Sequence, residues 1–238
     1  MKAIRVGMTA ASICLLQVVI CGVALCPSVL AWDVVIRSTS PASWSRVFAF
    51  SMLLAPSYIL FALCLMPLSA LAMRVVGART PPNVELRIAD MSWPLMTWAQ
   101  YMAANHVVRV VAGTLFRGSP VWTAYLRMNG ARIGRRVFVN TLSISDHNLL
   151  EFGDDVIIGA DVHISGHTVE DGMLKTAGVR LASNVTIGLG SAIDIGVEAG
   201  AHCQVGALSL VPKHTKLDAN AIYVGIPVRR IRANGDVR

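Results

Sequence analysis

The side chains best suited to acid–base chemistry gather in two short polar segments in the second half of the chain. One segment, residues 140–151, contains Asp146 and His147, and the other, residues 165–180, contains His167. Histidine titrates near neutral pH, so it can take a proton from an alcohol or amine that attacks an acyl group. Each segment is therefore a candidate site of proton transfer, and the surrounding elements decide how its side chains are placed.

On both sides of each polar segment, the sequence repeats with a period of six residues. Aliphatic residues recur at every sixth position, and a small or β-branched residue follows four positions after each. A period of six is not that of a helix, and strand alternation does not require it. It is the hexapeptide repeat of a parallel β-helix. The main series is Leu181, Ile187, Ile193, Ala199, Val205, Val211 and Leu217, and the earlier one is Ile133, Val139, Phe152, Ile158 and Ile164.

Each hexad is expected to form one flat side of a triangular coil. The aliphatic residue points into the prism, and glycine allows the tight turn at the corner. Residues 140–151 and 165–180 interrupt the period, and insertions in a solenoid project as loops, often from the binding face. The sequence predicts an all-β left-handed parallel β-helix over residues 130–232, with its polar chemistry on these two loops.

Specific motifs within this region match known enzymes. The matching stretches are GDDVIIG at 153–159, GHTV at 166–169, NVTIG at 184–188, VGALSLVPK at 205–213 and GIPVRRI at 225–231. They resemble the hexapeptide-repeat acetyltransferases, which include galactoside and maltose acetyltransferases. The stretches at 118–120, 125–127, 130–134 and 145–147 are similar to another branch, the membrane-bound terminal region of poly-lysine synthetase-like peptide synthetases.

The resemblance implies a homotrimer with active sites between neighbouring prisms. It implies that His167 is the catalytic base, because the motif around it matches the one that carries the family's catalytic histidine. Asp146 corresponds to an acidic residue that holds the acceptor, although it could equally be a turn former. His147 is the rival base. Glu170 and Asp171 could orient His167, bind a cationic acceptor or remain solvated charges.

The donor is expected to be acetyl-CoA or another acyl thioester. By resemblance, Ser209, Lys213 and Arg229 or Arg230 contact coenzyme A, with the cations meeting its phosphates. The chain departs from the acetyltransferase pattern at two positions: Leu208 replaces a glycine, and Thr186 replaces a tryptophan. Both departures favour the peptide-synthetase-like branch, whose donor would be a thioester on a carrier protein.

Metal binding and nucleic-acid binding are two other functional classes for this sequence. His163, His167 and His202 could form a zinc site of the carbonic anhydrase type, but their spacing is not that of a ligand set, so no metal is expected. The net charge of +7 suits anionic lipid or nucleic acid. Because no basic cluster with interleaved aromatics is present, nucleic acid is not an expected partner.

The N-terminal third has the composition of a membrane anchor. The chain is 54% hydrophobic and 15% charged, and two long runs carry no charged residue. Each run can cross a hydrocarbon core, which takes ~20 apolar residues. We expect a transmembrane hairpin in residues 1–75, with helices at about 6–32 and 47–73, rather than a signal peptide. Lysine and arginine flank the outer ends of the hairpin, which places both termini and the catalytic domain on the cytoplasmic side of the inner membrane.

Residues 76–129 mix aromatic, aliphatic and basic side chains. They are expected to form interfacial or linker helices at the membrane surface, or to cover the end of the soluble domain with their aromatics. Residues 233–238 are expected to form a tail.

The expected function is trimeric, membrane-anchored acyl transfer to a hydroxyl or amine. An aminoacyl-condensing enzyme fed by a carrier protein and a non-catalytic β-helix scaffold are the alternatives.

Overall fold

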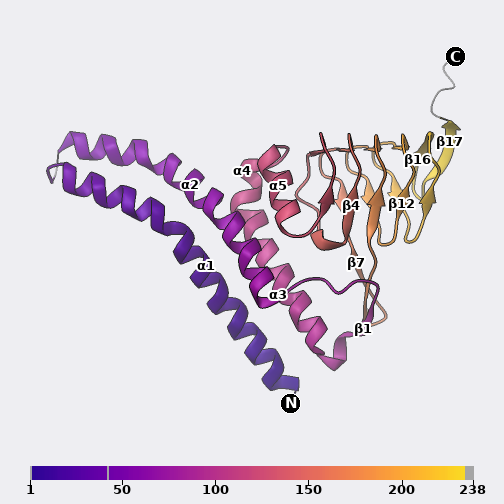
Figure 1. Ribbon diagram of the computed structural model, residues 1–238, viewed down its shortest axis with the longest axis horizontal. Coiled ribbons are helices and arrows are strands. Elements are labelled where there is room, and N and C mark those ends of the chain that lie inside the picture. Colours follow the sequence, from indigo (N-terminus) through magenta and orange to yellow (C-terminus); the bar gives the residue numbers. More distant parts are fainter. Residues whose placement is uncertain (1, 42, 234–238) are drawn as a thin grey trace.

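The computed structural model describes residues 2–41 and 43–233. Two long helices form a bent hairpin, shorter helices follow, and a stack of short strands completes the chain (Figure 1). The tail expected at 233–238 lies outside the described residues, except for Ala233.

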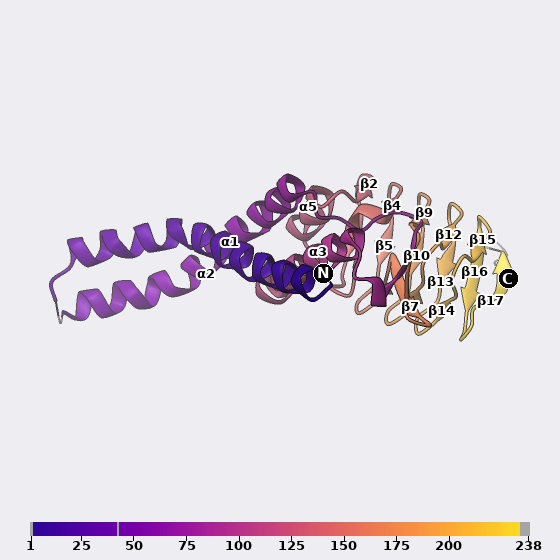
Figure 2. The ribbon, with the colours of Figure 1, turned by 90° about the horizontal axis from the view of Figure 1, so that it is seen from below.

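The hairpin consists of α1 (Lys2–Ser38) and α2 (Trp44–Val76), which lie side by side in both ribbon views (Figures 1 and 2). Both helices extend beyond the predicted 6–32 and 47–73, because the charged ends also adopt helical structure. The Ser43 hydroxyl caps α2 by accepting from the Arg46 amide, and Gly77 ends it in the left-handed conformation. Each helix is long and apolar enough to cross a membrane.

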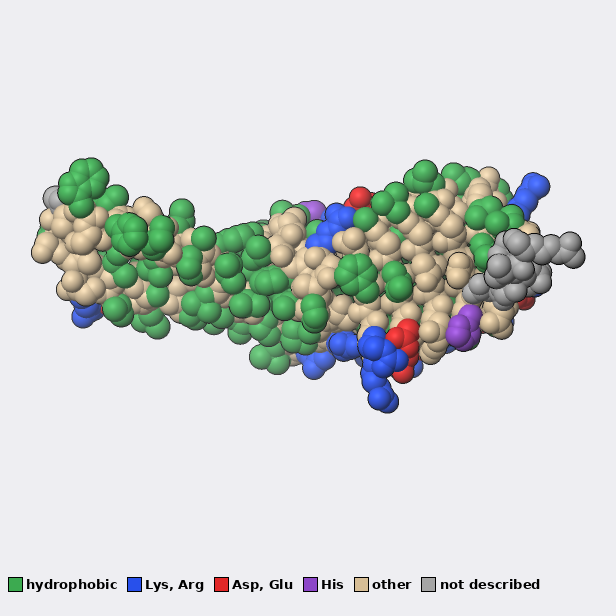
Figure 3. Space-filling model, turned by 90° about the horizontal axis from the view of Figure 1, so that it is seen from above, with side chains coloured by type: hydrophobic (Ala, Val, Ile, Leu, Met, Phe, Trp, Pro, Cys, Tyr) green, Lys and Arg blue, Asp and Glu red, His purple; other side chains and the backbone are tan. Residues whose placement is uncertain are grey.

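Hydrophobic side chains are spread along the face of the hairpin that Figure 3 shows. Leu15, Val18, Leu30 and Leu54 are each more than 60% exposed. Such a continuous apolar surface exceeds what a soluble domain usually presents to water. The two helices therefore support membrane association.

A mixed segment joins the hairpin to the strands. It contains β1 (Glu85–Arg87), the 3-10 turn η1 (Ile88–Asp90), α3 (Trp93–Val108), the π-helical turn η2 (Arg109–Gly113), α4 (Thr114–Phe116) and α5 (Pro120–Met128). Tyr101, Trp122 and Tyr125 are almost completely buried here. Trp122 and Tyr125 belong to the same buried cluster as the strand residues, and Tyr101 packs with Met73 and Ala78. Trp93, which is 56% exposed, is the exception.

The strands are short, because each hexad forms one side of the triangular coil and then turns at the corner. Their bounds are β2 Arg132–Ile133, β3 Phe138–Val139, β4 Leu150–Phe152, β5 Ile157–Ile158, β6 His163–Ile164, β7 His167–Glu170, β8 Met173–Thr176, β9 Val179–Leu181, β10 Thr186–Ile187, β11 Ala192–Ile193, β12 Glu198–Ala199, β13 Gln204–Val205, β14 Leu210–Val211, β15 Lys216–Leu217, β16 Ala221–Val224 and β17 Arg229–Ala233.

Consecutive strands along the main repeat belong to three different sheets. Their orders are β17-β16-β13-β10-β5-β3, β14-β11-β6 and β15-β12-β9-β4-β2. Strands β10, β11 and β12 each pair in parallel with the strand three hexads later, aligning Thr186 with Gln204, Ala192 with Leu210 and Glu198 with Lys216. This pairing is consistent with the parallel β-helix that the six-residue period predicts.

The periodic aliphatic residues form the core of this stack. From Leu181 to Leu217, all seven are at most 4% exposed. Residues between them, such as Glu198 and Lys216, point outward and carry the charges. The period of six therefore places one apolar side chain inside each side of the coil.

The two interruptions of the period fold differently. The first ends in the 3-10 turn η3 (His147–Leu149). The second is an antiparallel hairpin, β7–β8, rather than the loop expected from the sequence, and β1 pairs with β8 from the other side. This small sheet fixes the position of His167, which is the first residue of β7.

Candidate active site

Asp146 is the most completely enclosed carboxylate of the candidate site. It precedes η3 in the left-handed conformation, with φ of 53°, and its side chain is fully buried. Its Oδ1 accepts hydrogen bonds from the Thr80 hydroxyl at 2.6 Å and from Trp98 Nε1 at 3.3 Å. Its Oδ2 accepts from the Ser145 hydroxyl at 2.8 Å and from the Gly166 amide at 3.2 Å.

His167 completes the set of groups around this carboxylate. Its Nδ1 lies 2.6 Å from Asp146 Oδ2, and its ring meets Trp98 edge-on at 5.1 Å between centroids. Since an ionised carboxylate only accepts, Nδ1 carries the hydrogen and the neutral ring has its lone pair on Nε2. With 21% of the side chain exposed, this arrangement suits a base that is held by one nitrogen and reacts through the other.

The charge of Asp146 is stabilised by these donors. Burial acts to raise the pKa of Asp146, but the hydrogen bond and charge of His167, with the hydroxyls of Thr80 and Ser145, bring it below its ordinary value. The carboxylate therefore stays ionised at neutral pH and can stabilise a protonated His167.

Two small residues allow the carboxylate and the ring to approach. A Cβ at Gly166 would lie 2.8 Å from Asp146 Cβ, so a larger residue would push the two segments apart. The Ser165 hydroxyl accepts from the His167 amide at 3.2 Å and donates to the His167 carbonyl at 2.7 Å. This local turn orients the start of β7 toward Asp146.

Thr80 and Trp98 were not identified from the sequence as site residues. Thr80 is buried in the linker after α2, and Trp98 lies on α3. Neither belongs to a periodic pattern or to a matched motif, so only the folded chain brings them to Asp146. The aromatic run containing Trp98 was the one available signal, and it was assigned to covering or interfacial helices.

His147, the rival base, is placed apart from His167. Its side chain is buried, and its ring centroid lies 5.8 Å from that of Tyr125 and 6.3 Å from that of Tyr101. Burial lowers the pKa of His147 to about 4, with the charges of Asp146 and Arg109 acting in opposite directions. His147 is therefore neutral at pH 7 and packed among aromatics.

In the β7–β8 hairpin, Glu170 contacts cations instead of His167. Glu170 pairs with Lys175 and with Lys213, so it links the hairpin to the coil. This contact brings one of the expected donor-site cations to the hairpin that carries His167. Asp171 takes the left-handed conformation in the turn.

Within the described part of the chain, no contact joins His167 to Ser209, Arg229 or Arg230, the other residues expected at the donor site. Ser209 is buried, and its hydroxyl accepts from the Gly225 amide at 3.1 Å. Arg230 pairs with Asp218 at 3.0 Å, and Arg229 is exposed on β17. Leu208, which replaces a glycine, nevertheless has a left-handed backbone (φ of 55°) and is 66% exposed.

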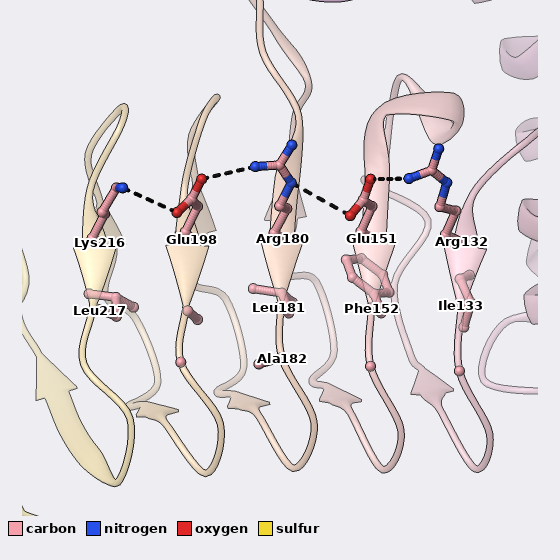
Figure 4. Close-up of a pocket in the computed structure, with 14 residues that line it drawn as sticks. Arg132, Ile133, Glu151, Phe152, Arg180, Leu181, Ala182, Glu198, Lys216 and Leu217 are labelled. Carbon is pink, nitrogen blue, oxygen red and sulfur yellow. Dashed lines mark hydrogen bonds and ion pairs between the residues drawn. The ribbon is translucent and has the colours of Figure 1, made fainter.

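A ladder of alternating charges lines an open groove on another face of the coil (Figure 4). Arg132 contacts Glu151 at 2.7 Å, Arg180 contacts Glu151 at 3.5 Å and Glu198 at 3.0 Å, and Lys216 contacts Glu198 at 3.5 Å. Because these charges are paired across neighbouring strands, the ladder stabilises the stack rather than offering free cations to a ligand.

Among the described residues, no group of three His, Cys, Asp or Glu side chains is arranged to hold a metal ion. The zinc alternative would use His163, His167 and His202. His167 is engaged with Asp146 instead.

Comparisons with known proteins agree with the motifs. No family model matches the chain. It is 28% identical over 111 residues to delta-poly-L-ornithine synthetase of Acinetobacter baumannii, covering 47% of this chain and 8% of that protein. It is 32% identical over 125 residues to galactoside O-acetyltransferase of Escherichia coli, covering 49% of this chain and 60% of that protein.

The chain thus spans less than two thirds of either relative. A solved hexapeptide-repeat acetyltransferase of Vibrio cholerae, in complex with acetyl-coenzyme A, is 20% identical with a TM-score of 0.41, covering 48% of this chain and 77% of that chain. The two sequence relatives match the two branches that the motifs indicated. These matches bear out the resemblance: the chain is similar in sequence to a galactoside O-acetyltransferase and to a poly-ornithine synthetase.

Proposed function

We propose that the chain is a membrane-anchored acyltransferase in which His167 is the general base and Asp146 its orienting carboxylate. The contact of 2.6 Å between His167 Nδ1 and the buried Asp146 Oδ2 carries this proposal. The similarity to galactoside O-acetyltransferase supports the reaction class.

The reaction begins when an acceptor hydroxyl or amine attacks the carbonyl carbon of a thioester. His167 Nε2 takes the proton that the acceptor loses, and Asp146 stabilises the imidazolium that forms. When the tetrahedral intermediate collapses, the C–S bond breaks and the imidazolium returns its proton to the leaving thiolate. A backbone N–H of a neighbouring coil would stabilise the oxyanion.

The donor is proposed to be acetyl-CoA. Lys213 is linked to the His167 hairpin through Glu170, which makes it the best supported of the donor-site residues. Arg229 and Arg230 would meet phosphates of the donor. Ser209 is the least supported of these residues, because its hydroxyl accepts from the Gly225 amide and its own amide donates to the Ser191 hydroxyl.

The catalytic part, residues 130–232, is proposed to be a left-handed β-helix that assembles as a homotrimer. The α1–α2 hairpin would span the inner membrane, with the catalytic part on the cytoplasmic side. The apolar, largely exposed surfaces of both helices support the membrane contact. Lys2 and Arg5, which donate to the carbonyls of Ala89 and Met91, would lie at the cytoplasmic boundary with Arg74.

A second candidate function is condensation of an aminoacyl thioester held by a carrier protein. The similarity to delta-poly-L-ornithine synthetase favours it. His167 and Asp146 would act in the same roles, with an amine as the nucleophile.

The proposal is tested by acetyl transfer from labelled acetyl-CoA to membrane extract, using the full chain in nanodiscs. His167→Ala should lower transfer by roughly 10²–10⁴-fold, the usual contribution of a general base. Val169→Ala is the matched control, because Val169 lies on the same strand and is 53% exposed. Equal transfer by wild type and His167→Ala would refute the role of His167, and transfer only from a carrier-bound aminoacyl thioester would establish the second function.

A further inference from the structure

An open pocket lies where the end of α2 meets the strand domain. Its volume is about 650 Å³, within the range of ligand pockets. Gly77 contributes to its lining at the end of α2, Asn83 contributes from the linker, and Gly178 contributes just before β9. The pocket therefore spans the junction between the proposed membrane anchor and the proposed catalytic part.

This pocket is strongly basic. Four arginines and one glutamate line it, an excess of three positive charges. The groove of Figure 4 has an excess of only one. In the smaller cavity that Lys175 and Lys213 line, two glutamates balance the two lysines. Because a concave site with cations of one sign concentrates their field, the pocket at the end of α2 favours an anionic ligand.

Two of its four arginines are available to such a ligand. Arg132 and Arg180 contact Glu151 at 2.7 Å and 3.5 Å, so this glutamate partly neutralises them. Arg74 and Arg79 are exposed, and within the described part of the chain neither guanidinium has a hydrogen bond or an ion pair. A guanidinium presents a planar fork of N–H donors that matches phosphate, and a phosphate has enough oxygens to accept from two arginines.

The position of Arg74 indicates where the phosphate comes from. Residues 47–73 contain no charged residue, and Arg74 is the first charge after this run, in the last turn of α2. In the proposed orientation, Arg74 lies where the hydrocarbon core gives way to the headgroups. Lipid phosphates are the anions found at this level, and juxtamembrane arginines are attracted to them.

Apolar side chains beside Arg74 suit the acyl chains of the same lipid. Leu71, Arg74 and Val75 are spaced i, i+3 and i+4, so they share one face of α2. Leu71 is 57% exposed and Val75 is 79% exposed. An acyl chain can therefore pack on this face of the helix while the phosphate contacts the guanidinium.

We propose that this pocket binds the phosphate of a membrane lipid, with Arg74 and Arg79 as its principal contacts. The phosphate site is independent of the proposed function, whereas its position at the membrane surface rests on it. Asn148, which also lines the pocket, is hydrogen-bonded to Thr80, and Thr80 in turn donates to Asp146. The bound headgroup thus lies beside residues that support the proposed catalytic pair.

Three probes test the two parts of this inference. Dioleoyl phosphatidic acid and dioleoylglycerol share their acyl chains and differ only in the phosphate, and glycerol 3-phosphate has the phosphate without the chains. Binding to the full chain in an uncharged detergent is followed by native mass spectrometry. Phosphatidic acid should bind in a saturable way. The other two should each need a concentration roughly tenfold higher or more, since each lacks one set of contacts.

Variants separate the pocket from the general surface charge. Arg74→Gln combined with Arg79→Gln removes both unpaired guanidiniums and should weaken phosphatidic acid binding by roughly tenfold or more. Arg87→Gln combined with Arg135→Gln is the matched control, because it removes two charges at exposed positions outside the pocket. The control should bind as the wild type does. Circular dichroism verifies that both double variants are folded.

Three results would overturn the inference. Equal binding of phosphatidic acid and dioleoylglycerol would mean that the phosphate is not recognised. Equal effects of the two double variants would mean that general charge, not the pocket, attracts the lipid. Glycerol 3-phosphate binding as tightly as phosphatidic acid would make a soluble phosphate the ligand.

The proposed function is tested separately by acetyl transfer. His167→Ala should lose transfer and still bind phosphatidic acid as the wild type does. Selective lipid binding by a wild-type chain that transfers no acetyl group would refute the proposed function alone.

Discussion

Asp146 Oδ2 lies 2.6 Å from His167 Nδ1, although the two residues are 21 positions apart and come from different interruptions of the six-residue period. The carboxylate is fully buried, whereas the imidazole is partly exposed. The buried partner therefore fixes the ring orientation, and the exposed edge is available to substrate. This division of roles is that of a base and its orienting acid.

Asp146→Asn should lower acetyl transfer by roughly 10²–10⁴-fold, because an amide cannot stabilise the imidazolium and can favour the wrong imidazole tautomer. The measurement is kcat with labelled acetyl-CoA in nanodiscs, with circular dichroism to verify folding. Thr80→Val removes one hydrogen bond to Oδ1 and should cost less than Asp146→Asn. A folded Asp146→Asn variant with nearly full kcat would contradict the role of the carboxylate.

The sequence indicated both residues as candidates, since each lies where the hexapeptide period breaks, but it assigned Asp146 to holding the acceptor and Glu170 or Asp171 to orienting His167. It could not predict Thr80 or Trp98, which reach Asp146 across 66 and 48 positions of sequence. Contacts of that range depend on how the linker and α3 fold back on the coil, and no local pattern encodes this. The β7–β8 hairpin is different, because its pairing is local and its two-residue turn, Asp171-Gly172 with both φ positive, follows the Asp-Gly pattern that favours such hairpins. Only the pairing of β8 with β1 is long-range.

Burial of the periodic aliphatic series was predictable, because each hexad must bury its apolar residue. The donor-site residues were expected from motif resemblance alone. That resemblance does not specify the partners that Ser209, Lys213 and Arg230 take in this chain, namely Gly225, Glu170 and Asp218.

Gly188→Ala should destabilise the coil by more than about 2 kcal/mol, as overpacking against rigid backbone does. A Cβ at position 188 would lie 2.4 Å from the Ala207 amide nitrogen in the next coil. Gly172→Ala is the control, because Gly172 has a left-handed φ of 71° but open space around it. It should cost only about 1 kcal/mol of backbone strain. Thermal unfolding in detergent measures both, and equal losses would contradict the close approach of the coils.

Glu198→Lys should place a third cation between Arg180 and Lys216 in the ladder of Figure 4. Like charges on adjacent strands are destabilising, and for these partly exposed side chains the cost should be about 1 kcal/mol. Glu198→Gln removes the charge without adding repulsion and should cost less. Raising the salt concentration to ~1 M, where the Debye length is ~3 Å, should shrink the difference between the two variants. An unfolding difference that is independent of salt would contradict an electrostatic role for the ladder.

His147 should make stability depend on pH between about 6.5 and about 4. Its pKa falls from 6.5 to about 4 in the folded chain, chiefly because of burial. In that window the unfolded chain binds a proton that the folded chain does not, so stability rises with pH and is lost as pH falls. The shift corresponds to roughly 3–4 kcal/mol at most, at 1.36 kcal/mol per pKa unit.

The measurement is the thermal midpoint of wild type and His147→Leu from pH 7 to pH 4. The variant should show a shallower slope, whatever its absolute stability, because leucine does not titrate. Asp146 acts in a lower window, since its pKa is depressed below 3.8 and its contribution is lost only as pH falls further. Parallel slopes for the two proteins would mean that His147 is not held neutral by burial.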